Sequence, residues 1–258
     1  MTVGSRRAAL RRLGDDPAGL GVFTDFDGTL SEIVPDPAAA GPLPGAVAAL
    51  TALAGRVGRV GVLSGRPVEF LQRQLPVPRT VVLAGLYGLE TIVDGTRLDH
   101  PLSGVWREVV DDVAAQSVAR GPAGMRVEAK GSSITLHYRE HPEIEGAVRA
   151  WADAQAARSG LALRPARMSF ELHPPIEVDK GTTLVELSDG LGAACFLGDD
   201  EGDLAAFDGL DRLAEAGLAT LRVGVRSAEG AAELLERADF VVDGPAGALA
   251  FIEAVAAP

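Results

Sequence analysis

The stretch Val22-Phe-Thr-Asp-Phe-Asp-Gly-Thr-Leu30 constrains the fold of this chain more than any other segment. Its apolar start predicts a short buried strand, which runs directly into Asp25 and Asp27. Residues i and i+2 of a strand share a face, so the two carboxylates would repel each other unless a cation lies between them or one is protonated. The segment therefore indicates one of two things. It is either a carboxylate nucleophile with a partner acid beside a hard cation such as Mg2+, or an ordinary Asp-Gly turn at a strand end.

Apolar strands alternate with helical patterns through most of the chain. Strands are predicted at 20–23, 59–63, 80–84, 194–197, 221–225 and 240–242, with helices between them. This order is typical of a parallel sheet with crossover helices. After a hairpin turn at Asp94-Gly95 the order changes to α-β-β-α-β-β, which predicts antiparallel strands backed by helices. We therefore expect an α/β, doubly wound, mostly parallel core (Rossmann-like) at 1–97 and 177–258, with an inserted α+β domain at 98–176.

Composition limits the classes of partner. The net charge of −12 argues against non-specific binding to nucleic acid or to an anionic membrane, so an anionic substrate would need local cations in its site. The single cysteine, Cys195, excludes an intramolecular disulfide and fits a reducing, cytoplasmic compartment. No segment has the apolar length of a membrane span, and the N-terminal segment lacks the apolar core of a signal peptide. A solvated first helix is expected there, carrying Arg6, Arg7, Arg11 and Arg12.

Four polar clusters follow predicted strands or begin helices. They are Asp25, Asp27 and Thr29; Ser64, Gly65 and Arg66; Lys180; and Asp199, Asp200 and Asp203. Each has an ordinary explanation alone, such as a helix cap for Ser64, a first-turn charge for Asp203 or a solvated helix residue for Lys180. Doubly wound sheets bind ligands at the carboxyl ends of their strands, so the combination favours a catalytic site. Only Lys130 and Lys180 among the 24 Lys and Arg residues are lysines, which indicates either sites that need a compact ammonium or the chance retention of two lysines.

DFDGT, Ser64-Gly-Arg, Lys180 and GDDEGD resemble, in this order, the four motifs of the haloacid dehalogenase superfamily of phosphatases. The resemblance covers the whole core, and the insert lies where the larger caps of this superfamily sit. Three further stretches are similar to trehalose-6-phosphate phosphatases: Gly85-Leu-Tyr-Gly-Leu-Glu90, the segment 127–139, and Phe170-Glu171 with Pro174 and Lys180-Gly181 after it. The fourth motif departs from the family pattern. Gly202 replaces the usual Thr, and Leu204 and Ala205 stand where acids are common, which leaves fewer groups to support a metal.

The resemblance implies a phosphatase that works through an aspartyl-phosphate. Asp25 would be the nucleophile and Asp27 the general acid and base, while Ser64 and Lys180 would hold the phosphate. The implied cofactor is Mg2+, with ligands from Asp25, the Asp27 carbonyl and Asp199 and with support from Asp200 and Asp203.

The resemblance also implies residues that bind the substrate. They are Arg66, Glu128, Lys130, Arg139, Arg167 and Glu171. Ordinary explanations remain open for some of them. Glu128 and Lys130 fit a same-face pair on an edge strand, and Arg139 fits a surface charge at a strand end. His137 is expected to pack or cap rather than to catalyse.

The favoured function is hydrolysis of trehalose 6-phosphate to trehalose and phosphate. One alternative is a phosphatase for another disaccharide-like or pseudosaccharide phosphate. A second, from another class, is a catalytically silent domain that binds a sugar phosphate or a glycosyltransferase partner. Intact Asp25, Asp27 and Lys180 argue against silence. Functional coupling to a glycosyltransferase that makes the sugar phosphate is expected.

Overall fold

The computed structural model describes residues 12–14, 16–34, 36, 39–166, 168–227 and 230–257, which form two compact units. The first unit comprises Met1–Leu98 and Val178–Pro258, and the second comprises Asp99–Glu177. Each border lies one residue beyond the one expected from the sequence. Nearly all of the expected N-terminal helix, with Arg6, Arg7 and Arg11, lies outside the described residues, and so does Arg167.

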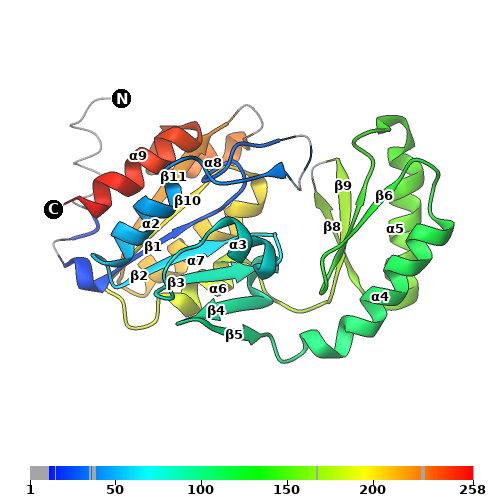
Figure 1. Ribbon diagram of the computed structural model, residues 1–258, viewed down its shortest axis with the longest axis horizontal. Helices are drawn as coiled ribbons and strands as arrows, with labels where there is room; N and C mark the ends of the chain where they lie inside the picture. Colours follow the sequence, from blue (N-terminus) through cyan, green and yellow to red (C-terminus); the bar gives the residue numbers. More distant parts are fainter. Residues whose placement is uncertain are drawn as a thin grey trace. The chain divides into compact units, whose positions relative to one another are not determined.

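An eight-stranded sheet forms the middle of the first unit (Figure 1). Its strand order is β12-β11-β10-β1-β2-β3-β4-β5, parallel from β12 to β3, with β4 antiparallel to β3. The parallel strands are β1 (Leu20–Thr24), β2 (Arg59–Leu63), β3 (Val81–Gly85), β10 (Ala193–Gly198), β11 (Ala219–Arg226) and β12 (Phe240–Asp243). The chain winds from β1 in one direction through β3 and later returns to wind in the other direction from β10. The doubly wound prediction is confirmed, and the switch point lies between β1 and β10.

The predicted turn at Asp94-Gly95 joins β4 (Glu90–Val93) to β5 (Thr96–Asp99), the strand at this edge of the sheet. Asp94 and Gly95 have φ values of 52° and 77°. Positive φ at both central residues suits the right-handed twist of a two-residue hairpin.

Helices cover both faces of the large sheet, which explains why its central strands are apolar along their whole length. All five residues of β1 are buried. One face packs against three helices: α2 (Ala46–Ala54), α3 (Val68–Gln74) and α9 (Gly244–Ala256). The other packs against α6 (Lys180–Leu187), α7 (Leu204–Glu215) and α8 (Ala232–Arg237).

The second unit is an antiparallel sheet with the order β6-β7-β9-β8 and with two long helices on one face (Figure 1). The elements are α4 (Ser103–Arg120), β6 (Arg126–Ala129), β7 (Ile134–His137), α5 (Glu145–Ser159), β8 (Ala162–Ala166) and β9 (Ser169–His173). Ile134, Leu136, Phe170 and Leu172 point to the helices and form the apolar core of this unit. Alternation along each strand therefore leaves the polar residues of β7 and β9 on the opposite face.

Short 3-10 helices complete the fold. They are η1 (Pro17–Gly19), η3 (Leu86–Gly88), η4 (Pro142–Ile144) and η5 (Glu201–Asp203). The second helix of the expected α-β-β-α-β-β order is preceded directly by a 3-10 turn, so that η4 runs into α5. None of the helices within the described residues combines the length and the apolar character needed to cross a membrane.

A capping box fixes the start of α6 at Lys180. The Asp179 side chain accepts a hydrogen bond from the Thr182 backbone N–H at 2.7 Å. The Asp179 N–H donates to the Thr182 hydroxyl at 2.9 Å, so two amides that the first turn leaves without helical partners are satisfied. The first helical position is unfavourable for a cation because of the helix dipole, so Lys180 needs acidic neighbours.

Replacing Asp179 with alanine should lower the free energy of unfolding by about 1 kcal/mol, because the cap is lost. Urea denaturation measures the change. The matched control is Asp179→Ser, which keeps a side-chain acceptor and should recover most of the loss. Equal stability of the two variants would contradict the capping role.

Candidate active site

The loop that follows β1 is held against the end of β10. The Asp25 N–H donates to the Leu197 carbonyl at 2.8 Å, which continues the β1–β10 pairing by one residue. Gly28 then turns with a φ of +77°, and a Cβ built there would lie 2.2 Å from Asp199 Oδ2. Only glycine allows this close approach, so the turn brings the first and fourth motifs together.

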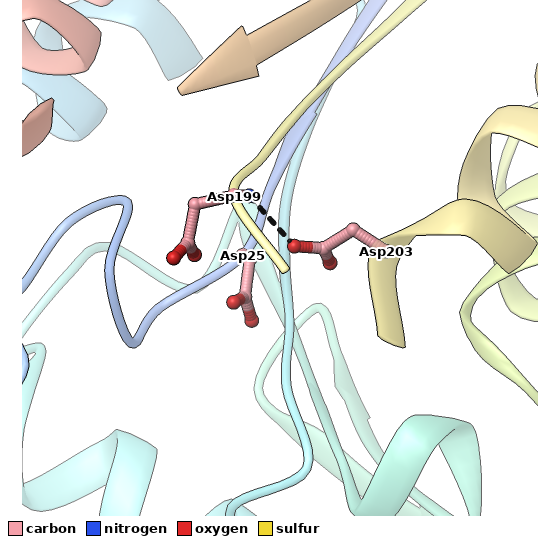
Figure 2. A group of neighbouring side chains, drawn as sticks. All are labelled: Asp25, Asp199 and Asp203. Carbon is pink, nitrogen blue, oxygen red and sulfur yellow. Dashed lines mark hydrogen bonds between the residues drawn. The ribbon is translucent and has the colours of Figure 1, made fainter. Parts of the chain in front are cut away.

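Three buried carboxylates meet at this switch point. Asp25, Asp199 and Asp203 each offer an oxygen, and these oxygens lie within 4.8 Å of one another. Figure 2 shows the Asp25 and Asp199 side chains beside each other. Asp203, at the end of η5, directs a carboxylate oxygen at the Asp199 backbone N–H. That hydrogen bond measures 2.9 Å, and a longer one of 3.3 Å comes from the Asp200 N–H.

Lys180 places its ammonium inside this cluster. Its Nζ lies 2.8 Å from Asp25 Oδ1 and donates to Asp203 Oδ1 at 2.6 Å. The lysine is 3% exposed although it is charged. It thus connects the sequence motifs that carry Asp25 and Asp203.

Burial and mutual repulsion shift the titration of the whole cluster. Burial, followed by the charges of Asp203 and Asp200, raises the pKa of Asp199 to about 8. Burial also raises the pKa of Asp203 to about 6, against the lowering effect of Lys180, and raises the pKa of Asp25 well above its usual value. Burial lowers the pKa of Lys180, but the carboxylates of Asp203 and Asp25 outweigh it and raise that pKa well above the ordinary value.

The cluster fits a hard divalent cation. Three carboxylates face one ammonium, so the ionised cluster carries excess negative charge in a buried place. All the acidic donors are oxygens, which Mg2+ and similar ions prefer. Asp200, which was expected to support the metal, is exposed and stands outside the group of three.

Two hydroxyls orient Asp199, and only one lies in a motif singled out from the sequence. Thr29 donates to Asp199 Oδ1 at 3.4 Å, and Ser227 donates to Oδ2 at 3.2 Å. Ser227 follows β11, the strand next to β10. The sequence could have indicated Ser227 as a site residue, because it lies just after a predicted parallel strand.

Asp27 is paired with Arg66 rather than with the acidic cluster. Arg66 donates from Nε to Asp27 Oδ2 and from Nη2 to Asp27 Oδ1, each at 2.7 Å. The guanidinium lies 4.6 Å from the centre of the Phe70 ring. This fork-to-fork geometry fixes the plane of the carboxylate. The expected substrate contact of Arg66 stays a prediction, and in this structure the side chain is already engaged.

The segment Gly85–Glu90 supports two of the motifs at once. Tyr87 N–H donates to the Ser64 carbonyl at 2.9 Å, and the Thr183 hydroxyl of α6 donates to the Tyr87 carbonyl at 3.0 Å. Leu86 and Tyr87 have φ values of 47° and 63°, a strained region for residues with side chains. The turn therefore links the Ser64 loop to the helix that begins with Lys180.

Comparison with known proteins identifies the family. The family model described as Trehalose-phosphatase matches residues 23–236. A trehalose-phosphate phosphatase of Mycobacterium ulcerans (strain Agy99) is 39% identical over 216 residues, which are 78% of this chain and 55% of that protein. The chain belongs to the trehalose-phosphatase family.

Other members of the family extend the likeness. A trehalose-phosphate phosphatase of Mycobacterium avium (strain 104) is 36% identical over 246 residues, which are 91% of this chain and 61% of the relative. This chain therefore spans little more than half the length of these relatives. The solved C-terminal domain of a C. albicans trehalose-6-phosphate phosphatase has the same fold. The two have a TM-score of 0.77 and 22% identity, over 97% of this chain and 96% of that one.

The second unit carries the residues expected to bind sugar in this family. Glu171 is 2% exposed and accepts from the Ser133 hydroxyl at 2.8 Å, with Lys130 Nζ 4.0 Å away. Glu128 pairs with His137 at 2.8 Å, so His137 has a partner in the polar face. Arg139 is exposed just after β7. The sugar-binding roles of these residues stay predictions.

Gly28→Ala should destabilise the protein more than Gly190→Ala. Gly190 has nearly the same φ, +76°, but a Cβ there would meet nothing within 4 Å. The control should therefore lose only about 1–2 kcal/mol of unfolding free energy through backbone strain. Gly28→Ala should lose more, because its Cβ displaces Asp199. Urea denaturation of both variants gives the difference, and equal losses would disprove the contact.

In a chelator, the free energy of unfolding should fall as the pH rises from about 6 to 9. The folded state holds the Asp199 proton up to a pKa of about 8, well above the usual value of 3.8. The stabilisation this proton gives is therefore lost as the pH rises through the folded pKa, by at most about 1.4 kcal/mol per pH unit for one group. Asp199→Asn should flatten the profile. A wild-type stability that rises over this range would contradict the assignment.

Proposed function

We propose that the protein is a Mg2+-dependent phosphatase that hydrolyses a sugar phosphate, with trehalose 6-phosphate as the favoured substrate. Family membership and the buried Asp25–Lys180–Asp203 arrangement support this function together. The observation that carries it is the Asp25 carboxylate, which lies at the switch point of the sheet with an ammonium 2.8 Å away.

Asp25 acts as the nucleophile. One of its carboxylate oxygens attacks phosphorus, the bond from phosphorus to the sugar oxygen breaks, and the leaving oxygen takes up a proton. Water then attacks the aspartyl-phosphate, and Asp25 and inorganic phosphate are released. Dividing the transfer into two steps suits a carboxylate nucleophile.

Lys180 and Ser64 hold the phosphate. The described residues supply two acidic partners for the three N–H groups of the ammonium, which leaves one to donate to a phosphate oxygen. The Ser64 hydroxyl accepts from the Arg66 N–H at 3.1 Å, so its own proton can be donated to the phosphate.

The ligands proposed for Mg2+ are Asp25, the Asp27 carbonyl and Asp199, with Asp203 in support. The ion supplies positive charge that lets an anionic nucleophile approach an anionic phosphate. Asp203 fixes the position of this set, because its carboxylate accepts hydrogen bonds from both the Lys180 ammonium and the Asp199 backbone N–H. Asp200 is exposed, and any support from it would come through its backbone.

Asp27 is proposed to give the proton to the sugar oxygen and then to take one from water. Both of its carboxylate oxygens accept from Arg66 in this structure. The acid role therefore requires Arg66 to release one oxygen as the substrate binds. A phosphate can form the same bidentate pair with the guanidinium, so the phosphate of the substrate is an alternative partner for Arg66.

The sugar phosphate itself is proposed to come from a glycosyltransferase reaction coupled to this enzyme. Both reactions are placed in the cytoplasm, in keeping with the free, buried thiol of Cys195.

Phosphate release from a panel of sugar phosphates tests the function. Wild-type protein with Mg2+ should favour trehalose 6-phosphate over other disaccharide and monosaccharide phosphates. Chelation should remove the activity and Mg2+ should restore it. Asp25→Asn should abolish the phosphatase activity with every ester, because an amide is not a competent nucleophile. The kcat of this variant should be at least ~10³-fold lower than that of wild type.

Asp208→Asn is the matched control for that substitution. Asp208 pairs with Arg237 at 2.7 Å on the surface of the first unit, so its loss should leave turnover unchanged. Retention of a tenth of the wild-type kcat by Asp25→Asn would refute the nucleophile. Binding of sugar phosphates without any turnover by wild-type protein would instead favour a silent binding domain.

A further inference from the structure

A buried hydroxyl in the second unit has no hydrogen-bond partner within the described part of the chain. Thr135, on β7, is 3% exposed, and its Oγ1 makes no hydrogen bond with any described residue. A buried polar group without a partner lowers stability. Valine has the same branched shape and an equal preference for strands, so the strand itself does not require the hydroxyl.

Thr135 lies in a row of polar residues that crosses the sheet. It pairs with Glu128 on β6 and with Glu171 on β9, and Glu171 pairs with Arg164 on β8. Residues paired across neighbouring strands share a face of the sheet. The row therefore runs carboxylate, hydroxyl, carboxylate, guanidinium, on the face opposite α4 and α5.

The acceptors on either side of Thr135 are already engaged by other donors. Glu128 Oε2 is 2.8 Å from His137 Nε2, and Glu171 Oε1 accepts from Ser133 at 2.8 Å. Each contact engages one carboxylate oxygen, and neither carboxylate is hydrogen-bonded to the Thr135 hydroxyl. The Glu128 side chain is 30% exposed, so solvent reaches the row at the β6 end.

The chemistry around Thr135 selects a neutral, hydroxyl-rich ligand. Two carboxylates flank it and would repel a phosphate. Sugar hydroxyls can donate to carboxylates and also accept from the Thr135 hydroxyl and from the Lys130 ammonium, whose Nζ lies 4.0 Å from Glu171. The geometry points to Thr135 as a specificity-determining residue that bonds one hydroxyl of the uncharged sugar ring of the substrate. The inference rests on the proposed function and adds to it a residue outside the expected sugar-binding set.

Thr135→Val tests the inference, with Thr135→Ser as the conservative variant. With trehalose 6-phosphate, the valine variant should raise KM by about three- to tenfold, the range of one neutral hydrogen bond, with kcat little changed. Serine should restore most of the loss. Monodeoxy analogues of trehalose 6-phosphate make the test more specific. One analogue lacks the hydroxyl that Thr135 bonds, and wild type should have a higher KM for it than for the full substrate. The valine variant should lose this difference and keep any difference that wild type shows for the other analogues.

Ser103→Ala is the matched control. Ser103, at the start of α4, carries another buried hydroxyl that makes no hydrogen bond with any described residue. Both Ser103→Ala and Thr135→Val should raise the Tm of the ligand-free protein by roughly 1–5 °C, because each removes an unsatisfied polar atom. Only Thr135→Val should change KM. A lower Tm for Thr135→Val would reveal an internal partner and overturn the inference.

Trehalose binding, measured by saturation-transfer NMR, separates this inference from the proposed function. If wild-type protein binds trehalose and Thr135→Val binds it more weakly, the inference stands even without turnover. If both bind trehalose equally, or if wild type does not bind it, the inference fails whatever the phosphatase assay gives. If Thr135→Val and wild type had the same KM for trehalose 6-phosphate and for every monodeoxy analogue, the inference would also be overturned. That result is expected if the Thr135 hydroxyl is hydrogen-bonded only to water.

Discussion

The contact of the Lys180 ammonium with Asp25 and Asp203 is the interaction on which the site depends. It joins a strand end, a helix start and a 3-10 turn that are far apart in the sequence. Removing one member of a buried ion pair typically costs about 3–5 kcal/mol, because the remaining charge is left without compensation. The Asp179 cap and the bond from Thr183 to Tyr87 serve this contact, since both fix the first turn of α6.

The two units carry different chemistry. The first concentrates buried charge at the switch point of its sheet, where an ester phosphate and a divalent cation would compensate one another. The second presents a polar sheet face in which hydroxyls and paired charges alternate. Such a face suits neutral hydroxyl groups, because the carboxylates of Glu128 and Glu171 each already have a hydrogen-bond partner. Under the proposed function, reactivity and sugar selection would therefore change independently by substitution in different units.

Much of this arrangement could be predicted from the sequence, because parallel strands bring their ends together. The strand over 59–63 is observed as predicted, and Asp25 and Asp199 meet because β1 and β10 are neighbours. The pairing of Arg66 with Asp27 could not be predicted, since it depends on a loop conformation, and the contact of Ser227 with Asp199 was indicated only by the place of Ser227 after a strand. The exposure of Asp200 could not be predicted either, nor could the absence of a partner for Thr135 among the residues that the structure describes, because only side-chain packing reveals them.

The pairing of β1 with β10 also bears on how the protein forms. Thr29 and Asp199, which touch at the switch point, are separated by 170 residues of chain. During synthesis β1 can pair with β2 early, but its other edge stays open until the second unit and α6 have been made. Contacts of such long sequence separation form slowly because loop closure must precede them. The exposed edge of an apolar strand is then a site for mispairing, and the acidic cluster can assemble only after most of the chain has left the ribosome.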